Sequence, residues 1–183
     1  RERETERHLT PPCPLALSRR PVPWPSHAAL ASPRERCAQA YIAAGEVDAC
    51  EALVDRMEAD GLLPDTRLLN TVLNGYARQL RWDRASKLLR RLTARGVVAD
   101  YASYFALLRA CAGARVPFEA MRALRLMREA GHQPDVRAYS LILSCNAKVG
   151  RLPASLKLLQ QMRSEGLRPN GHVYAGLMEA CIV

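Results

Sequence analysis

Short polar side chains recur at a fixed spacing along this chain of 183 residues. The phrases "GLLPD", "GVVAD", "GHQPD" and "GLRPN" begin 35 residues apart and close on Asp65, Asp100, Asp135 and Asn170. Carboxylate and amide oxygens accept hydrogen bonds, and the amide nitrogen also donates them. The recurrence raises two questions: which structure repeats every 35 residues, and what these side chains do in it.

Catalytic and metal-binding chemistry finds little support in the sequence. None of His8, His27, His132 and His172 is followed two places later by Glu, as the His-x-Glu site of a zinc deaminase requires. The six cysteines form no Cys-x-x-Cys pair and no set with zinc spacing, which favours small apolar residues of a reduced protein. No nuclease-like cluster of aspartates occurs. We therefore expect no enzyme activity, no metal, no cofactor and no small-molecule substrate.

The composition favours helices and a polyanionic partner. Ala, Leu and Arg dominate while aromatic residues make up only 5%, a mixture that suits helices better than strands. The formal net charge of +9 favours a polyanion, most often nucleic acid. No stretch approaches 18 uncharged apolar residues, so we expect no membrane span.

Residues 1–30 differ from the rest of the chain. The run "TPPCPLALSRRPVPWPSHAALASP" is rich in proline, and no acid occurs between Arg7 and Arg34. This composition is typical of an organelle transit peptide, whereas the acidic start "RERETE" favours a disordered linker. We interpret the segment as disordered, with a transit-peptide remnant as the alternative. The start without methionine and the ending "EACIV" are typical of a fragment.

From Ala31 the 35-residue period indicates a tandem array. The units are 31–65, 66–100, 101–135, 136–170 and a truncated 171–183. Residues of one kind share a place in each complete unit. These are Gly61, Gly96, Gly131 and Gly166 at the 31st place, Met57, Leu92, Met127 and Met162 at the 27th, and the small Cys50, Ala85, Ala120 and Ser155 at the 20th.

Each unit is expected to contain two helices. In the second unit, apolar residues recur at helical spacing over 67–78 and again over 83–94, where Asp83 is a plausible N-cap. The recurring glycine is expected to end the second helix in the left-handed conformation. One hairpin cannot bury its apolar face alone, so neighbouring hairpins should stack. The fold class that we expect is an all-α, right-handed α-solenoid of helix–turn–helix repeats.

At this point the units resemble pentatricopeptide repeats over residues 31–183. The matching landmarks in the fourth unit are Tyr139, Gly150, Met162, Gly166 and the closing Pro169–Asn170. Tetratricopeptide repeats run 34 residues with a different pattern. The resemblance implies an organellar protein, mitochondrial or plastid, in which one repeat reads one base of single-stranded RNA. It also implies a role in RNA processing or expression, with other processing proteins as further partners.

The resemblance further implies which residues read bases. In the family, the fifth and last residues of a repeat recognise the base, and short polar side chains can match a Watson–Crick edge. Two of the resulting pairs follow the family pattern: Asn70 with Asp100 is a combination associated with uridine, and Ser140 with Asn170 resembles an adenine-type pair.

Two further pairs depart from that pattern. Phe105, paired with Asp135, has no hydrogen-bonding edge, so it could stack on a base or leave its position unread. Glu35, paired with Asp65, places two carboxylates near one base and would repel phosphates, so this unit could serve as a cap. Ala175 holds the fifth place of the truncated unit.

Two other places are expected to meet the RNA. The second place, usually aliphatic in the family, could stack on bases or contact phosphate, or be an exposed polar position. The family tends to meet phosphate at the 13th place, where the third unit has Gly113. The residues concerned are Arg67, Ala102, Arg137 and His172 at the second place, and Arg78 and Lys148 at the 13th.

A protein-interaction scaffold is the alternative function. Phe105 and Glu35 favour the scaffold, while the polar pairs of the second and fourth units favour RNA. Many basic residues also fall in second helices, the outer layer of such arrays, so part of the positive charge could be a solvated back. Binding that weakens steeply with added salt would distinguish nucleic acid from a protein partner.

Overall fold

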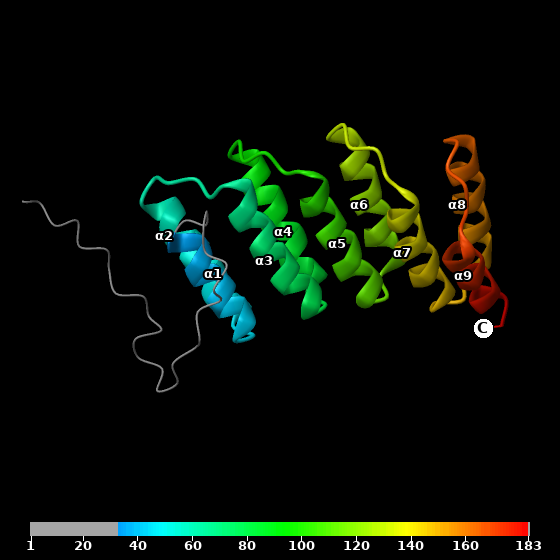
Figure 1. Ribbon diagram of the computed structural model, residues 1–183, viewed down its shortest axis with the longest axis horizontal. Helices are drawn as coiled ribbons and strands as arrows, with labels where there is room; N and C mark the ends of the chain where they lie inside the picture. Colours follow the sequence, from blue (N-terminus) through cyan, green and yellow to red (C-terminus); the bar gives the residue numbers. More distant parts are fainter. Residues whose placement is uncertain (1–32, 183) are drawn as a thin grey trace, which may run out of the picture.

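The computed structural model describes residues 33–182, whose helices follow one another in pairs (Figure 1). Residues 1–30, interpreted above as a disordered segment or a transit-peptide remnant, lie outside the described residues. Within 33–182 the chain is helical and has no strand, which confirms the expected all-α class. The helices are α1 (Pro33–Ala43), α2 (Val47–Ala59), α3 (Thr66–Arg78), α4 (Trp82–Ala94), α5 (Tyr101–Gly113), α6 (Pro117–Glu129), α7 (Val136–Ala147), α8 (Leu152–Ser164) and α9 (Gly171–Ile182).

The helices pack in two layers. The first helices of the repeats are α1, α3, α5, α7 and α9, and each contacts the next one in this series. The second helices, α2, α4, α6 and α8, contact the first helix of their own repeat and that of the following one. This arrangement is a solenoid, with α1 near one end and α9 near the other (Figure 1).

The small residues of the 20th place lie where the two layers meet. Cys50, Ala85, Ala120 and Ser155 are all fully buried, at 0% exposure. Small side chains at these points allow the second helices to approach the first helices closely. The buried thiol of Cys111 also lies in the core, and this burial raises its pKa to about 12.

The recurring glycine ends each second helix as expected. Gly61 follows α2 with φ of 73°, and the N–H of Leu62 donates to the carbonyl of Met57 at 2.8 Å, which closes the helix end. The first helices end with the same backbone conformation at the 15th place of the repeat, where Leu80 and Arg115 have φ of 58° and 57°. Glycine holds that place in the first and fourth repeats.

The start of α4 differs from the expectation. The helix begins at Trp82 with Arg81 as its N-cap, so the prediction that Asp83 is the N-cap was wrong. Asp83 lies within the first turn, where a negative charge interacts favourably with the helix dipole. Pro117 and Pro153 lie in the first turns of α6 and α8, where a missing N–H costs little.

Candidate nucleic-acid interface

The closing residue of each repeat caps the first helix of the next repeat. Its side-chain oxygen accepts a hydrogen bond from a backbone N–H three residues later, at 2.9 Å for the aspartates and 3.1 Å for the asparagine. Asp and Asn are preferred at this position because they satisfy a helix N–H that has no partner within the helix. The recurrence therefore has a structural cause that was not predicted from the sequence. The capping residues are Asp65, Asp100, Asp135 and Asn170.

In the second repeat, the two predicted base-reading side chains meet. The Nδ2 of Asn70 donates to both carboxylate oxygens of Asp100, at 3.1 and 3.0 Å. The hydroxyl of Ser103 donates to Oδ1 of Asn70 at 2.6 Å. Because both acceptor oxygens belong to one carboxylate, a single N–H points at them. The second N–H and the second lone pair of the Asn70 amide take no part in this network.

Asp100 is held in its charged form at this site. Partial burial opposes its ionisation, but hydrogen bonds from Ser103 and Asn70 outweigh the burial and lower the pKa of the carboxyl. Ser103, which was not predicted from the sequence, is itself fully buried and completes a capping box with Asp100. The Asp-x-x-Ser spacing is the signal that could have identified it.

The third repeat has a different arrangement. The ring of Phe105 stacks on that of Tyr101, with centroids 5.8 Å apart and an interplanar angle of 17°. The guanidinium of Arg137 lies over the Phe105 ring at 5.6 Å, and its Nε donates to Asp135 at 2.8 Å. Arg137 is the second residue of the fourth repeat, yet it contacts both predicted base-reading residues of the third repeat, Phe105 and Asp135.

Asp135 is also held as a carboxylate. Partial burial opposes its ionisation, but Tyr101, Arg137 and the capped backbone of Ala138 outweigh the burial and lower the pKa of Asp135. Burial and the neighbouring Asp135 in turn raise the pKa of Tyr101 to about 12.

Ser140 and Asn170, the predicted pair of the fourth repeat, do not form such a network. The hydroxyl of Ser140 donates to the carbonyl of Val136 at 2.8 Å, and no bond joins it to Asn170 in the described part of the chain. Ala175 is exposed on α9. Asp65 is exposed, and Glu35 lies in α1 with its side chain outside the described residues.

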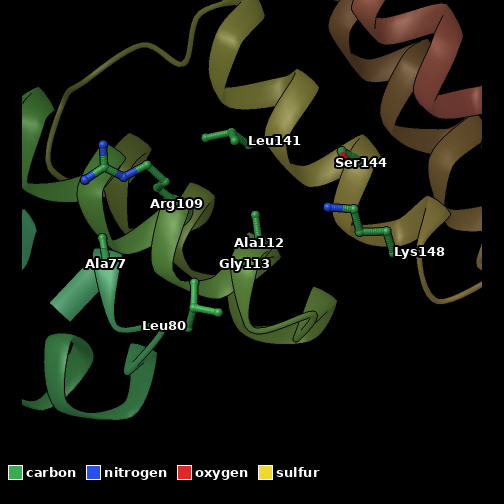
Figure 2. A pocket seen from close by; sticks show the side chains of 8 residues that line it. All are labelled: Ala77, Leu80, Arg109, Ala112, Gly113, Leu141, Ser144 and Lys148. Atoms are coloured by element: carbon green, nitrogen blue, oxygen red, sulfur yellow. The ribbon is translucent and has the colours of Figure 1, made fainter.

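The residues expected to stack on bases or contact phosphate are all at the surface. The 13th place of the third repeat, Gly113, lies at a hollow of about 230 Å³ between α3, α5 and α7. Figure 2 shows Arg109 and Lys148 at opposite sides of this hollow. The exposed residues are Arg67, Ala102, Arg137 and His172 at the second place, and Arg78 and Lys148 at the 13th.

The two layers differ in charge. Helices α3, α5 and α7 contain arginines and no Asp or Glu. Several arginines of the second helices are instead paired with acids, so part of the outer positive charge is neutralised. These pairs are Arg84 with Glu51, Arg91 with Asp55 and Glu58, Arg122 with Glu119, and Arg128 with Glu165.

Within residues 33–182, no helix is both long and apolar enough to cross a membrane. The same residues contain no group of three or more His, Cys, Asp or Glu placed to hold a metal ion.

The fold and this surface define a helical-repeat protein that presents polar and basic side chains on its first helices. Two family models match the sequence. The family model for the pentacotripeptide-repeat region of PRORP matches residues 25–116. The family model for the pentatricopeptide repeat domain matches residues 87–148 and 130–183. The chain belongs to the pentatricopeptide repeat family. A comparison with curated proteins found no match.

Solved structures agree with this assignment. The pentatricopeptide repeat protein PPR10 from maize is 31% identical with a TM-score of 0.65, over 80% of this chain and 21% of that one. Its complex with an 18-nt psaJ RNA element matches at 26% identity and a TM-score of 0.65, over 80% and 22% of the two chains. The domain of Arabidopsis thaliana protein-only RNase P 1 in complex with tRNA, at 18% identity, a TM-score of 0.67 and 79% and 77% coverage, shares the fold. The present chain thus spans about a fifth of PPR10.

Proposed function

We propose that this segment binds single-stranded RNA, and that side chains at the N-terminal ends of its first helices read individual bases. The observation that carries the proposal is the network of Asn70, Asp100 and Ser103. It holds one amide in a fixed orientation beside an ionised carboxylate and leaves part of its hydrogen-bonding capacity open.

The chemistry of this network suits a pyrimidine such as uracil. Uracil presents the acceptor O4 beside the donor N3–H, and an amide offers a donor and an acceptor in return. The Asp100 carboxylate and the Ser103 hydroxyl fix which end of the amide donates and which accepts. A fixed donor and acceptor can discriminate between bases, whereas a freely rotating amide would accept several.

The charge distribution supports a nucleic-acid partner over a protein scaffold. Phosphates would meet α3, α5 and α7, which contain no Asp or Glu, while several arginines of the second helices are paired with acids. The basic residues on α3, α5 and α7 are Arg67, Arg78, Arg109 and Arg137, and Lys148 directly follows α7.

The proposal also includes a cellular location and the process in which the RNA binding takes part. PPR10 is described in complex with an RNA element, and protein-only RNase P 1 in complex with tRNA. By this likeness we propose that the present chain acts in RNA processing or expression in a mitochondrion or plastid, and that it binds RNA rather than catalysing a reaction on it.

A salt-dependent titration tests the proposal. The segment should bind short single-stranded RNAs that contain U and A, with a Kd on the order of micromolar or weaker, because few bases contribute about 1–3 kcal/mol each. If three to five phosphates are contacted, the slope of log K against log salt should lie between about −2 and −3.5. Absence of RNA binding, or binding that does not respond to salt, would contradict the proposal and favour the scaffold.

A further inference from the structure

The third repeat lacks the polar side chain that reads a base in the second. Phe105 replaces the amide, and its ring stacks on Tyr101 to form an apolar plate that is only partly buried. An aromatic ring can stack on any base, but it has no donor or acceptor with which to distinguish them. Selection at this repeat therefore requires another residue.

Arg137 supplies hydrogen-bond donors at this position. Two contacts fix its guanidinium: Nε donates to Asp135, and the group lies over the Phe105 ring. Asp135 is itself fixed, since it caps α7 through the N–H of Ala138 at 2.9 Å. The side chain of Arg137 remains 73% exposed. Nε makes the bond to Asp135, so the terminal Nη groups of this largely exposed side chain keep N–H donors for a further partner.

An arginine held beside an aromatic ring should bind one base in preference to the others. Two parallel N–H groups match two adjacent acceptors, and guanine presents O6 and N7 in this arrangement. Adenine places a donor beside N7, and uracil separates its two carbonyls by a donor. Cytosine also has adjacent acceptors, but its single ring covers less of the aromatic plate.

We propose that the third repeat selects guanine, with Arg137 of the following repeat as the specificity-determining residue and Phe105 as the stacking surface. This inference rests on the proposed RNA binding. It assigns Arg137 to a base rather than to phosphate, and it makes the third repeat a reading position despite its phenylalanine.

Arg67 offers a matched control. It holds the second place of the second repeat, as Arg137 does in the fourth, and it is also exposed. The residue that would face it in the first repeat is Glu35 rather than an aromatic residue. In the described part of the chain, no ion pair joins Arg67 to Asp65, in contrast to Arg137 and Asp135.

The experiment is a selection from RNAs with three adjacent randomised positions, carried out on the segment and on the variants Arg137→Ala, Arg137→Lys and Arg67→Ala. The unmodified segment should prefer guanine about tenfold at the position next to the selected uracil. Arg137→Ala and Arg137→Lys should both abolish this preference, the latter because lysine keeps the charge but lacks the planar fork. Both should keep the uracil preference. Arg67→Ala should weaken binding to all sequences equally.

The outcomes separate the two claims. Uracil selection without guanine selection, or guanine selection that survives Arg137→Lys, overturns the assignment of Arg137 while RNA binding stands. Cytosine in place of guanine overturns it as well. If no sequence binds, the proposed function fails and this inference fails with it.

Discussion

The side chain of Asp100 caps α5 and also orients the amide of Asn70. A capping carboxylate is already immobilised by the helix, so little conformational entropy remains to be lost when a base binds. Ser103 adds the second constraint by donating to Oδ1 of Asn70. A helix-capping requirement and a base-reading requirement can therefore be met by the same residue.

Replacing Asn70 tests the reading role. Asn70→Ser should shift the preferred base at the second repeat from U towards A or C, because the shorter hydroxyl does not reproduce the amide's donor and acceptor. We expect the free energy of unfolding to fall by no more than about 1 kcal/mol, the net value of a typical hydrogen bond. A selection experiment and a urea titration measure the two quantities.

Asn74→Ser is the matched control. Asn74 lies one turn further along α3 and accepts a hydrogen bond from Arg109 at 2.8 Å. This substitution should leave the base preference unchanged. An unchanged preference in Asn70→Ser, or the same shift in both variants, would count against the reading role of Asn70.

Of the contacts that these residues make, those between neighbouring repeats could not be predicted from the sequence. The pairing of Asn70 with Asp100 could be anticipated from the family resemblance, since both belong to one repeat. The contacts of Arg137 with Phe105 and Asp135 could not, because they depend on how neighbouring hairpins are offset. A period fixes which residues are equivalent, but it does not give that offset.

The ends of the helices were partly predictable for a similar reason. The glycines at the 31st place identify the ends of the second helices, because glycine adopts positive φ without a steric penalty. The first helices end in the same conformation. In the second and third repeats the residues concerned are Leu80 and Arg115, so no glycine indicates these helix ends in the sequence. These two residues accept a conformation that costs a non-glycine residue roughly 1–2 kcal/mol.

Arg115→Gly should stabilise the array. The substitution relieves the left-handed strain between α5 and α6, and the greater freedom of glycine in the unfolded chain offsets part of the gain. We expect the free energy of unfolding to rise by about 0.5–1 kcal/mol, measured by urea denaturation. Arg125→Gly, on the exposed face of α6, should instead lower it by about 1 kcal/mol. A loss of stability in Arg115→Gly would contradict the account of this turn.

At the scale of the whole array, the second helices α2, α4 and α6 carry charges of both signs, whereas α3, α5 and α7 carry no acid. Acids and arginines of neighbouring second helices pair across repeats, as Glu51 does with Arg84 and Asp55 with Arg91. The first helices α3, α5 and α7 carry positive charge alone. The solenoid and its layers follow from the sequence period. The cross-repeat ion pairs do not, because they require the lateral placement of one hairpin against the next.

We propose that RNA contacts the first helices and that Asn70 lies at this contact. The most direct measurement is the ¹H–¹⁵N spectrum of the side-chain amides during titration with a U- and A-containing RNA. We expect the side-chain amide resonance of Asn70 to shift, while that of Gln160, exposed on the second helix α8, keeps its position. A shift of the Gln160 resonance with an unchanged Asn70 resonance would show that RNA does not contact the first helices in this way.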